Sequence, residues 1–326
     1  MNRLPFRMTL IAVLIPFALA VAGVAIQLAW LPSLPATIAT HWSFDGTPDA
    51  FGPAWTMPVL LGVVGILLPA LCAVLLGLGG KSSPTFWQKF IAVTSLFVGV
   101  MLSFVVTASV GIQVARPVDA PAADIPGFLA IGVGAGLVLA LVGWFVLPRA
   151  VNGRSVQDAP AAPVKVGPGE RVAWVGRARY STTLLTILVV ALVLVTAIVL
   201  YAAVTAGIWW ALLVPVIVGV SVLGTASWPV RIDDTGLTVR SALGWPRFVV
   251  KAAEVETAGV AQVTPLGEFG GYGLRYAPNG RVGIVTRRGE ALDVQRRNGR
   301  ALVVTVDDAG TAAGLLTTLS ARRAKG

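Results

Sequence analysis

The sequence predicts a polytopic α-helical membrane protein with about six transmembrane helices, followed by a β-rich C-terminal domain that one helix caps. Three observations lead to this fold class. Only 12% of the 326 residues are charged and 56% are hydrophobic, whereas an ordinary globular domain carries about 25% charged residues on its surface. Six long apolar runs contain no Asp, Glu, Lys, Arg or His. After Trp228 the apolar pattern shortens into runs that are typical of β-strands.

The six apolar runs are long enough to cross a bilayer, which takes about 20 residues. They cover residues 8–30, 57–79, 90–112, 127–147, 182–204 and 208–228. Tryptophans stand at or near the ends of these runs, as expected for side chains that prefer the membrane–water interface. These residues are Trp30, Trp55, Trp87, Trp144, Trp209, Trp210 and Trp228.

The first run has a second interpretation, a cleaved signal peptide. Arg3 and Arg7 precede the run, and Ala18-Leu19-Ala20 has the small residues of a cleavage site. The apolar run nevertheless continues to Leu31, which makes it longer than the apolar region of a typical signal peptide. This length favours an uncleaved helix.

The placement of Lys and Arg predicts the orientation, because cytoplasmic loops are enriched in these residues. Of the 25 basic residues, 24 fall in the N-terminal tip and in segments 80–89, 148–181 and 229–326. Six spans put all of these segments on one side and leave only Arg116 on the other. We therefore expect a multi-pass protein of the cell (plasma) membrane, with both termini in the cytoplasm.

The net charge of +10 could indicate a nucleic-acid partner. The predicted orientation gives another explanation, because the basic excess then faces the anionic lipids of the cytoplasmic leaflet. We expect membrane lipids as partners, and no nucleic acid.

The spans give little evidence for transport chemistry. Pro16, Pro69 and Pro215 could mark the broken helices of a small-solute or lipid transporter. They could equally be kinks whose freed carbonyls are bonded by neighbouring helices. Gly132 and Gly136 have the spacing that lets helices approach closely, and we expect it to serve internal packing. The oligomeric state stays open.

The connection between the first two spans, residues 31–56, is the most distinctive stretch. Asp45-Gly46 is a tight-turn signal, Pro35 begins an extended run, and Pro48 stiffens the exit. We expect a structured outer loop. Its motif residues are Leu34, Pro35, Ile38, His41, Trp42, Gly46, Pro48 and Asp49.

This motif resembles a domain of unknown function found at the N-terminus of SdpI-type toxin-immunity membrane proteins. The resemblance covers about residues 10–80, with Ser43 where Asn is common and Ala54 where a basic residue often stands. It implies a membrane protein that is not an established enzyme. In the SdpI-type case it implies immunity to an envelope toxin and relay of a signal.

His41 with Asp45 and Asp49 could bind a metal or respond to pH. Metal sites usually gather more ligands, so a turn stabilised by side-chain hydrogen bonds is the simpler interpretation. A membrane hydrolase is a further alternative, although the chain has one His and no nucleophile-elbow, zinc-protease or P-loop motif. The single cysteine, Cys72, has no ligand companion. We predict a non-enzymatic protein with no cofactor and no metal.

The C-terminal part is predicted to begin with a linker, residues 148–168, and a segment at 169–177 that lies along the membrane interface. Short β-prone runs follow, with hairpin turns at 278–280 and 297–299. An amphipathic helix then runs from Asp307, the predicted N-cap, to about Arg322. The expected strands cover residues 230–233, 237–241, 247–251, 256–263, 273–276, 281–287, 291–296 and 301–306.

This order of strands and helix resembles the bacterial pleckstrin-homology-like (PH-like) domains. Residues 234–240, 289–293 and 304–319 carry the likeness, and the 169–174 segment is similar to the lead-in of membrane-tethered members. The resemblance covers about residues 229–323. It implies a module that binds protein or lipid, with no catalytic residues.

Five arginines in this part are expected to cluster on adjacent strands or turns. They could bind anionic lipid or an acidic cytoplasmic protein, or form a solvated face. They are Arg287, Arg288, Arg296, Arg297 and Arg300.

The predicted organisation combines these segments into one function. A two-helix domain with the outer loop (1–80) precedes spans three and four (81–147). The linker and interfacial segment (148–181), spans five and six (182–228) and the PH-like domain (229–326) follow. The predicted role is envelope sensing or toxin-immunity-like signalling through the cytoplasmic domain.

Overall fold

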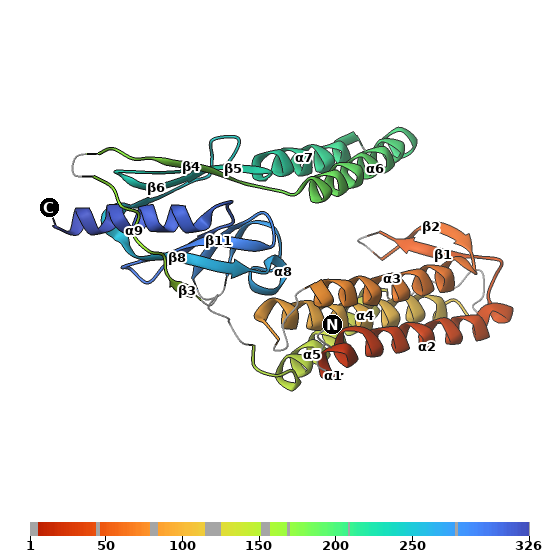
Figure 1. Cartoon of the computed structure of the whole chain (residues 1–326). Coiled ribbons are helices and arrows are strands. Elements are labelled where there is room, and N and C mark those ends of the chain that lie inside the picture. Colours follow the sequence, from red (N-terminus) through yellow and green to blue (C-terminus); the bar gives the residue numbers. More distant parts are fainter. Residues whose placement is uncertain are drawn as a thin grey trace. The chain divides into compact units, whose positions relative to one another are not determined.

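A computed structural model describes residues 6–43, 46–78, 84–114, 125–150, 157–167, 170–207, 209–277 and 280–325. The chain divides into two compact units, Met1–Val151 and Asn152–Gly326 (Figure 1). The polytopic helical part and the β-rich C-terminal part that the sequence predicts are both present.

The first unit is a bundle of apolar helices with a β-hairpin (Figure 1). Its first span, Phe6–Ser33, is one helical rod in which a π-helical turn, η1, interrupts the α-helical hydrogen bonding. The elements of the rod are α1 (Phe6–Thr9), η1 (Leu10–Leu14), α2 (Ile15–Trp30) and η2 (Leu31–Ser33). The rest of the unit comprises β1 (Thr37–Trp42), β2 (Pro48–Pro53), α3 (Thr56–Leu78), α4 (Phe86–Gly111) and α5 (Ile125–Val146).

Pro16 explains the π-helical turn. Proline has no backbone N–H, so the carbonyl of Ala12, four residues earlier, loses its helical donor. The hydroxyl of Ser95 on α4 donates to that carbonyl at 2.7 Å. The carbonyl that Pro16 leaves without a helical donor is therefore bonded by a neighbouring helix. Pro69 lies inside the continuous helix α3.

Glycines set the closest helix contacts in this bundle. A Cβ at Gly136 of α5 would lie 2.9 Å from the carbonyl oxygen of Phe97 on α4, and one at Gly132 would lie 2.6 Å from Val105. The Gly132/Gly136 spacing thus serves packing of α5 against α4, as predicted.

Two basic residues meet the C-terminal end of α5. The Lys89 ammonium donates to the carbonyl of Leu147 at 3.4 Å and lies 4.5 Å from the centre of the Trp144 ring. Arg7 donates to the carbonyl of Val146 at 3.4 Å. Cations are favourable at this end of a helix, because its last carbonyls carry partial negative charge.

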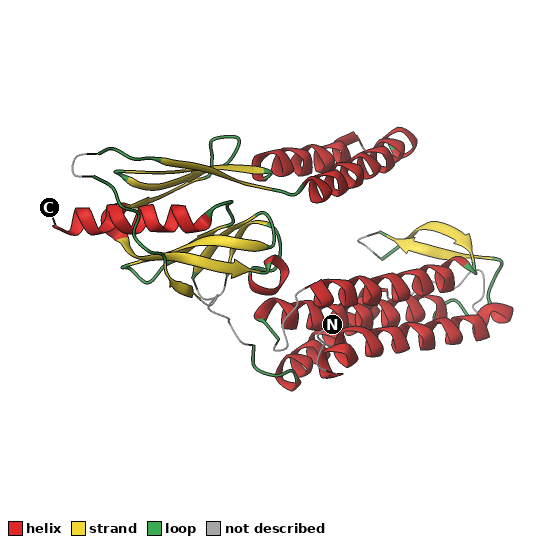
Figure 2. Ribbon diagram, in the orientation of Figure 1, coloured by secondary structure: helices red, strands yellow, loops and turns green. Residues whose placement is uncertain are grey.

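The second unit contains two β-sheets, a helical hairpin and a C-terminal helix (Figure 2). The four-stranded sheet is antiparallel in the order β4 (Trp174–Arg179), β5 (Ser227–Asp233), β6 (Gly236–Arg240) and β7 (Arg247–Lys251). The six-stranded sheet has the order β3-β8-β11-β12-β10-β9, and its β10–β12 pair is parallel. Its elements are β3 (Gln157–Pro160), β8 (Val255–Val263), β9 (Gly273–Tyr276), β10 (Arg281–Val285), β11 (Gly289–Arg296) and β12 (Ala301–Val304), with η4 (Ala252–Glu254) before β8 and α8 (Pro265–Glu268) after it.

The C-terminal helix α9 (Ala309–Lys325) packs against strands of both sheets and completes the main core. The predicted apolar face is buried as a whole: Ala309, Ala312, Ala313, Leu316 and Leu319. The N-cap prediction was wrong by one residue. Asp308, which has φ +58°, accepts from the amide of Thr311, whereas Asp307 pairs with Arg287.

Five helices in the described residues are long and apolar enough to span a membrane, and the sixth predicted span is shorter. This last segment, Trp209–Thr225, comprises η3 (Trp209–Leu212) and α7 (Leu213–Thr225). It follows the 25-residue helix α6 (Thr182–Ala206), and a span needs at least about 17 residues. Since β4 and β5 pair with Arg179 opposite Ser227, the chain leaves and re-enters the sheet at the same place. If α6 crosses a membrane, η3 and α7 must therefore return across it.

The segment 148–181 differs from its prediction. Residues 157–160 form strand β3 within the predicted linker, and residues 174–179 form strand β4, where no strand was predicted. The stretch between them follows α9, where Thr318 donates to the carbonyl of Val164 at 2.9 Å and Arg322 to that of Val166 at 2.6 Å. The C-terminal domain therefore begins before α6, and the α6–α7 hairpin is inserted between two of its strands.

Candidate functional site

The outer loop is a β-hairpin with two compensating irregularities. Ala39 lies opposite Phe51 and His41 opposite Ala50, which leaves Thr40 as the extra residue on β1. Trp42 then lies opposite Pro48, which leaves Asp49 as the extra residue on β2. Bulges of this kind redirect side chains. Here they place Asp49 beside His41.

The apolar motif residues anchor the hairpin to the bundle. Ile38 is buried to 2% exposure against Met57 of α3 and Val110 of α4. Leu34 and Trp42 pack against the same cluster, together with Trp30. This burial explains why the motif carries Leu, Ile and Trp at positions 34, 38 and 42.

Gln113, in the turn after α4, holds strand β1 in place. Its side-chain amide bonds both backbone groups of Ala39, as the backbone of a neighbouring strand would. Its Oε1 accepts from the amide of Ala39 at 2.7 Å, and its Nε2 donates to the carbonyl of Ala39 at 3.1 Å. Nε2 also donates to the carbonyl of Ser109 at 2.8 Å. The sequence prediction did not include Gln113. The only feature of the sequence that points to it is the position of one amide side chain directly after the apolar run 90–112.

The tip of the hairpin is closed by short-range hydrogen bonds. The amide of Ser43 donates to the carbonyl of Thr47 at 2.9 Å, and the Ser43 hydroxyl lies 2.8 Å from that of Thr47. Gly46 has φ +83°, a backbone conformation that favours glycine. The predicted turn residue Asp45 lies outside the described residues.

His41 and Asp49 form an exposed pair on this anchored frame. Nδ1 of His41 lies 2.5 Å from Oδ1 of Asp49, and the two side chains are 69% and 45% exposed. A hydrogen bond from Nδ1–H to the carboxylate would leave Nε2 free to bind a ligand. No group of three or more His, Cys, Asp or Glu side chains suited to a metal occurs among the residues that the structure describes. The pair therefore presents two polar side chains to solvent.

Residues 18–66 match the family model of a domain of unknown function, DUF1648. The DUF1648 segment includes the whole hairpin and all eight motif residues, so the predicted resemblance of the N-terminal region is confirmed. The link from DUF1648 to SdpI-type proteins is a general association of that domain. No curated protein and no solved structure matches the chain. The PH-like assignment of the C-terminal domain accordingly stays a prediction.

The five arginines proposed as a cluster lie at the two ends of β11. Arg287 and Arg288 precede this eight-residue strand, and Arg297 and Arg300 follow it. At about 3.4 Å per residue, the strand separates the two groups by about 27 Å. The prediction of one cluster was wrong, because β11 runs its full length between them.

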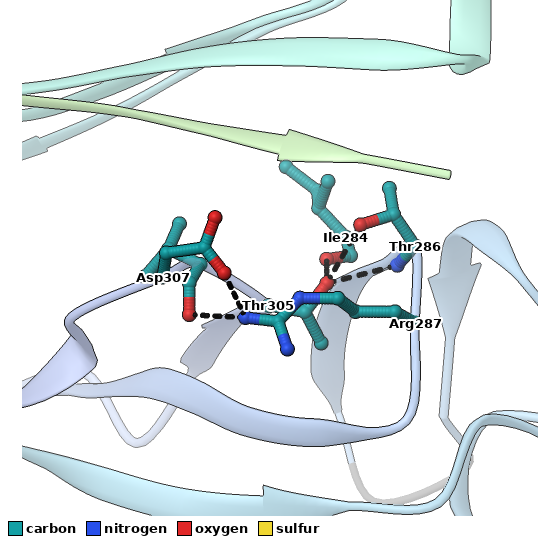
Figure 3. A network of polar contacts seen from close by, with 6 residues as sticks. Ile284, Thr286, Arg287, Thr305 and Asp307 are labelled. Carbon is teal, nitrogen blue, oxygen red and sulfur yellow. Dashed lines mark hydrogen bonds and ion pairs between the residues drawn. The ribbon is translucent and has the colours of Figure 1, made fainter. Parts of the chain in front are cut away.

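Arg287 belongs to a local network that closes the end of the sheet (Figure 3). It donates to the carbonyl of Val306 at 2.9 Å and to the carboxylate of Asp307 at 2.7 Å. Beside it, the hydroxyl of Thr305 accepts from the amide of Thr286 at 2.9 Å. These contacts join the β10–β11 turn to the chain that enters α9.

A buried ionic cluster, absent from the sequence predictions, joins β10, β11 and α8. The guanidinium of Arg281 lies 3.5 Å from the carboxylate of Asp293 and 3.9 Å from that of Glu268. All three side chains are at most 8% exposed. The Arg281 guanidinium also lies 5.3 Å from the centre of the Phe269 ring. Since these groups are buried, we assign the cluster a structural role.

Proposed function

We propose that the protein is a non-enzymatic sensor of the cell membrane that recognises an envelope molecule at the hairpin and signals through the C-terminal β domain. The observation that carries this proposal is the exposed His41–Asp49 pair on a firmly held frame. Ile38 and Gln113 fix one face of the hairpin to the bundle, while the other face presents a polar pair to solvent. A recognition site benefits from such rigidity, because less ordering is required when a ligand binds.

The distribution of charge supports the orientation that this function requires. In the described part of the first unit, the basic residues Arg7, Lys89 and Arg149 lie far along the chain from the hairpin. The hairpin itself carries an acidic residue, Asp49. The β4–β5 pairing favours an even number of crossings for α6 and α7. Six crossings would put the hairpin outside the cell, and would leave both termini and the β domain in the cytoplasm.

A ligand at the hairpin would have a route into the bundle through α4. Gln113 joins the hairpin to the end of this helix. Six residues earlier along the chain, Thr107 of α4 accepts a hydrogen bond of 3.2 Å from the fully buried Gln27 of α2. A ligand shifts such an arrangement only when it binds one of two states more tightly. The proposal therefore predicts that the occupancy of the β domain by its cytoplasmic partner depends on the hairpin.

The experiment compares two variants of the full chain in native membranes. His41→Gln removes the contact with Asp49, and Thr37→Ala is a matched control on the same exposed strand. A photo-crosslinking residue at Asn298, in an exposed turn of the β domain, reports partner capture. We expect His41→Gln to change the captured amount several-fold and Thr37→Ala to leave it unchanged. No captured partner, or equal capture in both variants, would contradict the proposal.

Orientation is tested separately by cysteine labelling. In a Cys72→Ala background, Thr37→Cys should react with an impermeant reagent on intact cells, and Asn298→Cys only after lysis. Labelling of Asn298→Cys on intact cells would place the β domain outside and refute the proposed direction of signalling. Solute flux in proteoliposomes would instead favour the transporter alternative. Hydrolysis that disappears in His41→Ala would favour the hydrolase alternative.

A further inference from the structure

The two faces of the four-stranded sheet differ sharply in chemistry. The inner face is buried in the main core and includes Ala178, Trp228, Val230, Val239 and Val250. On the outer face, six basic residues accompany one acidic residue, Asp233. The basic residues are Arg177, Arg179, Arg231, Arg240, Arg247 and Lys251.

Strand register gathers four of these arginines at the end of the sheet that adjoins the helical hairpin. Arg179 lies opposite Ser227, only two residues after α7 ends. One step further along, Arg177 lies opposite Pro229, and Arg240 lies opposite Arg247. Because Val230 pairs with Val239, Pro229 stands between Arg177 and Arg240. We name Arg177, Arg179, Arg240 and Arg247 the arginine patch.

The arginine patch has no internal counter-charge. Like charges directly opposite each other on a sheet are destabilising, and Arg240 faces Arg247 in this way. Within the described residues, the guanidinium groups of these four arginines form no hydrogen bond or ion pair, although their backbones pair in the sheet. Asp233 lies at the opposite end of the sheet and is bonded to Arg231 at 2.9 Å. An external anion would relieve this repulsion.

The turn between β6 and β7 extends from the same end of the sheet and carries exposed apolar side chains. Trp245 is 82% exposed and Leu243 is 63% exposed. The turn is held by the Ser241 hydroxyl, which donates to the carbonyl of Trp245 at 2.6 Å. Leu243 is close to the last turn of α7, since a Cβ at Gly224 would lie 3.1 Å from its Cδ1. Trp245 and Leu243 therefore lie at the level where α7 ends.

We propose that this end of the sheet binds the phosphate groups of anionic phospholipids through the arginine patch, while Trp245 and Leu243 enter the membrane interface. A membrane crossed by the α6–α7 hairpin would lie next to this end of the sheet, because β4 leads into α6 and α7 leads into β5 (Figures 1 and 2). Arg179 and Arg177 precede the first residue of α6, Thr182, by about 10 and 17 Å of extended chain. Long arginine side chains reach back toward headgroups over part of that distance. The guanidinium also matches a phosphate with two parallel hydrogen bonds. This site is independent of the proposed sensing role and of the direction of signalling.

The first test measures depth in the membrane. Bimane is attached to Trp245→Cys in a full-length Cys72→Ala chain, in nanodiscs of phosphatidylcholine with or without phosphatidylglycerol. The control is Asp234→Cys, in the turn at the other end of the same sheet. We expect a lipid-attached quencher to quench the label at position 245 strongly and the label at 234 little. Equal quenching at both positions would overturn the proposed insertion.

The second test measures how much the arginine patch contributes to binding of anionic lipid. The readout is protection of residues 236–251 from hydrogen exchange. Arg177→Gln, Arg240→Gln and Arg247→Gln are combined in one variant. The control combines Arg171→Gln, Arg275→Gln and Arg323→Gln, three exposed arginines outside the arginine patch, and removes the same amount of charge. At about fivefold per arginine at low salt, the first variant should lose phosphatidylglycerol-dependent protection by on the order of 100-fold. The control should keep it.

Two outcomes would overturn the lipid assignment. Protection that is the same with and without phosphatidylglycerol would remove the role of anionic lipid. Equal protection of the detergent-solubilised chain by inorganic phosphate would assign the patch to a free anion instead.

Discussion

The hydroxyl of Ser95 donates a 2.7 Å hydrogen bond to the carbonyl of Ala12, which Pro16 leaves without a helical donor. A backbone carbonyl without a donor is costly in hydrocarbon, so proline in a spanning helix needs a partner of this kind. The contact also joins the first span to α4, against which Pro16 packs closely at Gly99. One serine thus supplies the donor that the first span lacks and joins this span to α4.

Ser95→Ala should destabilise the protein by about 0.6–2 kcal/mol, because the Ala12 carbonyl would lose its donor. In a Pro16→Ala background the helix regains its own N–H, and the same substitution should cost less. A double-mutant cycle of unfolding in detergent measures the difference. Ser221→Ala, which removes a hydroxyl bonded within its own helix, serves as the control. A cycle with zero coupling energy would contradict the role assigned to Ser95.

Gly136→Leu should destabilise the bundle by about 1–3 kcal/mol or separate α5 from α4, because the new side chain would collide with the backbone of Phe97. Gly134→Leu is the matched control, since no atom lies within 4 Å of a Cβ at that position. Thermal unfolding of the two variants gives the comparison. Comparable loss in both would mean that the close approach of α5 and α4 is unimportant.

The features predicted correctly from sequence are those that repeat along the chain. Apolar runs of spanning length predicted the helices, and the 3.6-residue period of Ala309, Ala312, Leu316 and Leu319 predicted the buried face of α9. The Arg297-Asn-Gly299 turn is also present, with Gly299 at φ +77°. Each of these signals is local, so no knowledge of long-range pairing was required.

The features that were missed depend on residues far apart in sequence. Residues 169–177 were expected along the interface and no strand was predicted there, whereas Trp174–Arg179 pairs with β5 across the inserted hairpin. The five arginines near β11 were grouped by sequence distance, although an extended strand carries its ends far apart. Gln113 and Ala39 are 74 residues apart. Such contacts are decided by tertiary structure, and no period in the sequence signals them.

Gln113→Ala should loosen the hairpin without unfolding the bundle, because it removes the two hydrogen bonds to Ala39. Each bond is worth about 1 kcal/mol, so exchange of the Ala39 amide should accelerate by about 10-fold or more. Thr40→Val, which removes only the 3.3 Å bond to the carbonyl of Ala50, should have a smaller effect. Unchanged exchange in Gln113→Ala would show that the apolar contacts of Ile38 suffice.

Asp233 should contribute stability that disappears in acid. The hydroxyl and amide of Thr235 donate to its carboxylate, and these bonds hold the pKa of Asp233 below its usual value. A carboxylate with a lowered folded-state pKa stabilises above its unfolded-state pKa, and this contribution is lost as the pH falls through the folded-state pKa. Asp233→Asn should thus be less stable than the wild type by about 1 kcal/mol at neutral pH, and the two should converge in acid. Melting temperatures across a pH series check this, and a difference that persists in acid would contradict it.

Arg281→Met should be the most damaging of these changes, because it leaves the carboxylates of Asp293 and Glu268 buried beside each other without the guanidinium. Removal of one partner from a buried ion pair costs about 3–5 kcal/mol. Adding Glu268→Gln and Asp293→Asn to Arg281→Met should restore part of the loss, because neutral amides avoid the repulsion of two buried anions. Arg275→Met, at an exposed position on the neighbouring strand β9, is the control. If Arg281→Met unfolds no more readily than Arg275→Met, the charge balance of the buried cluster cannot be what holds β10, β11 and α8 together.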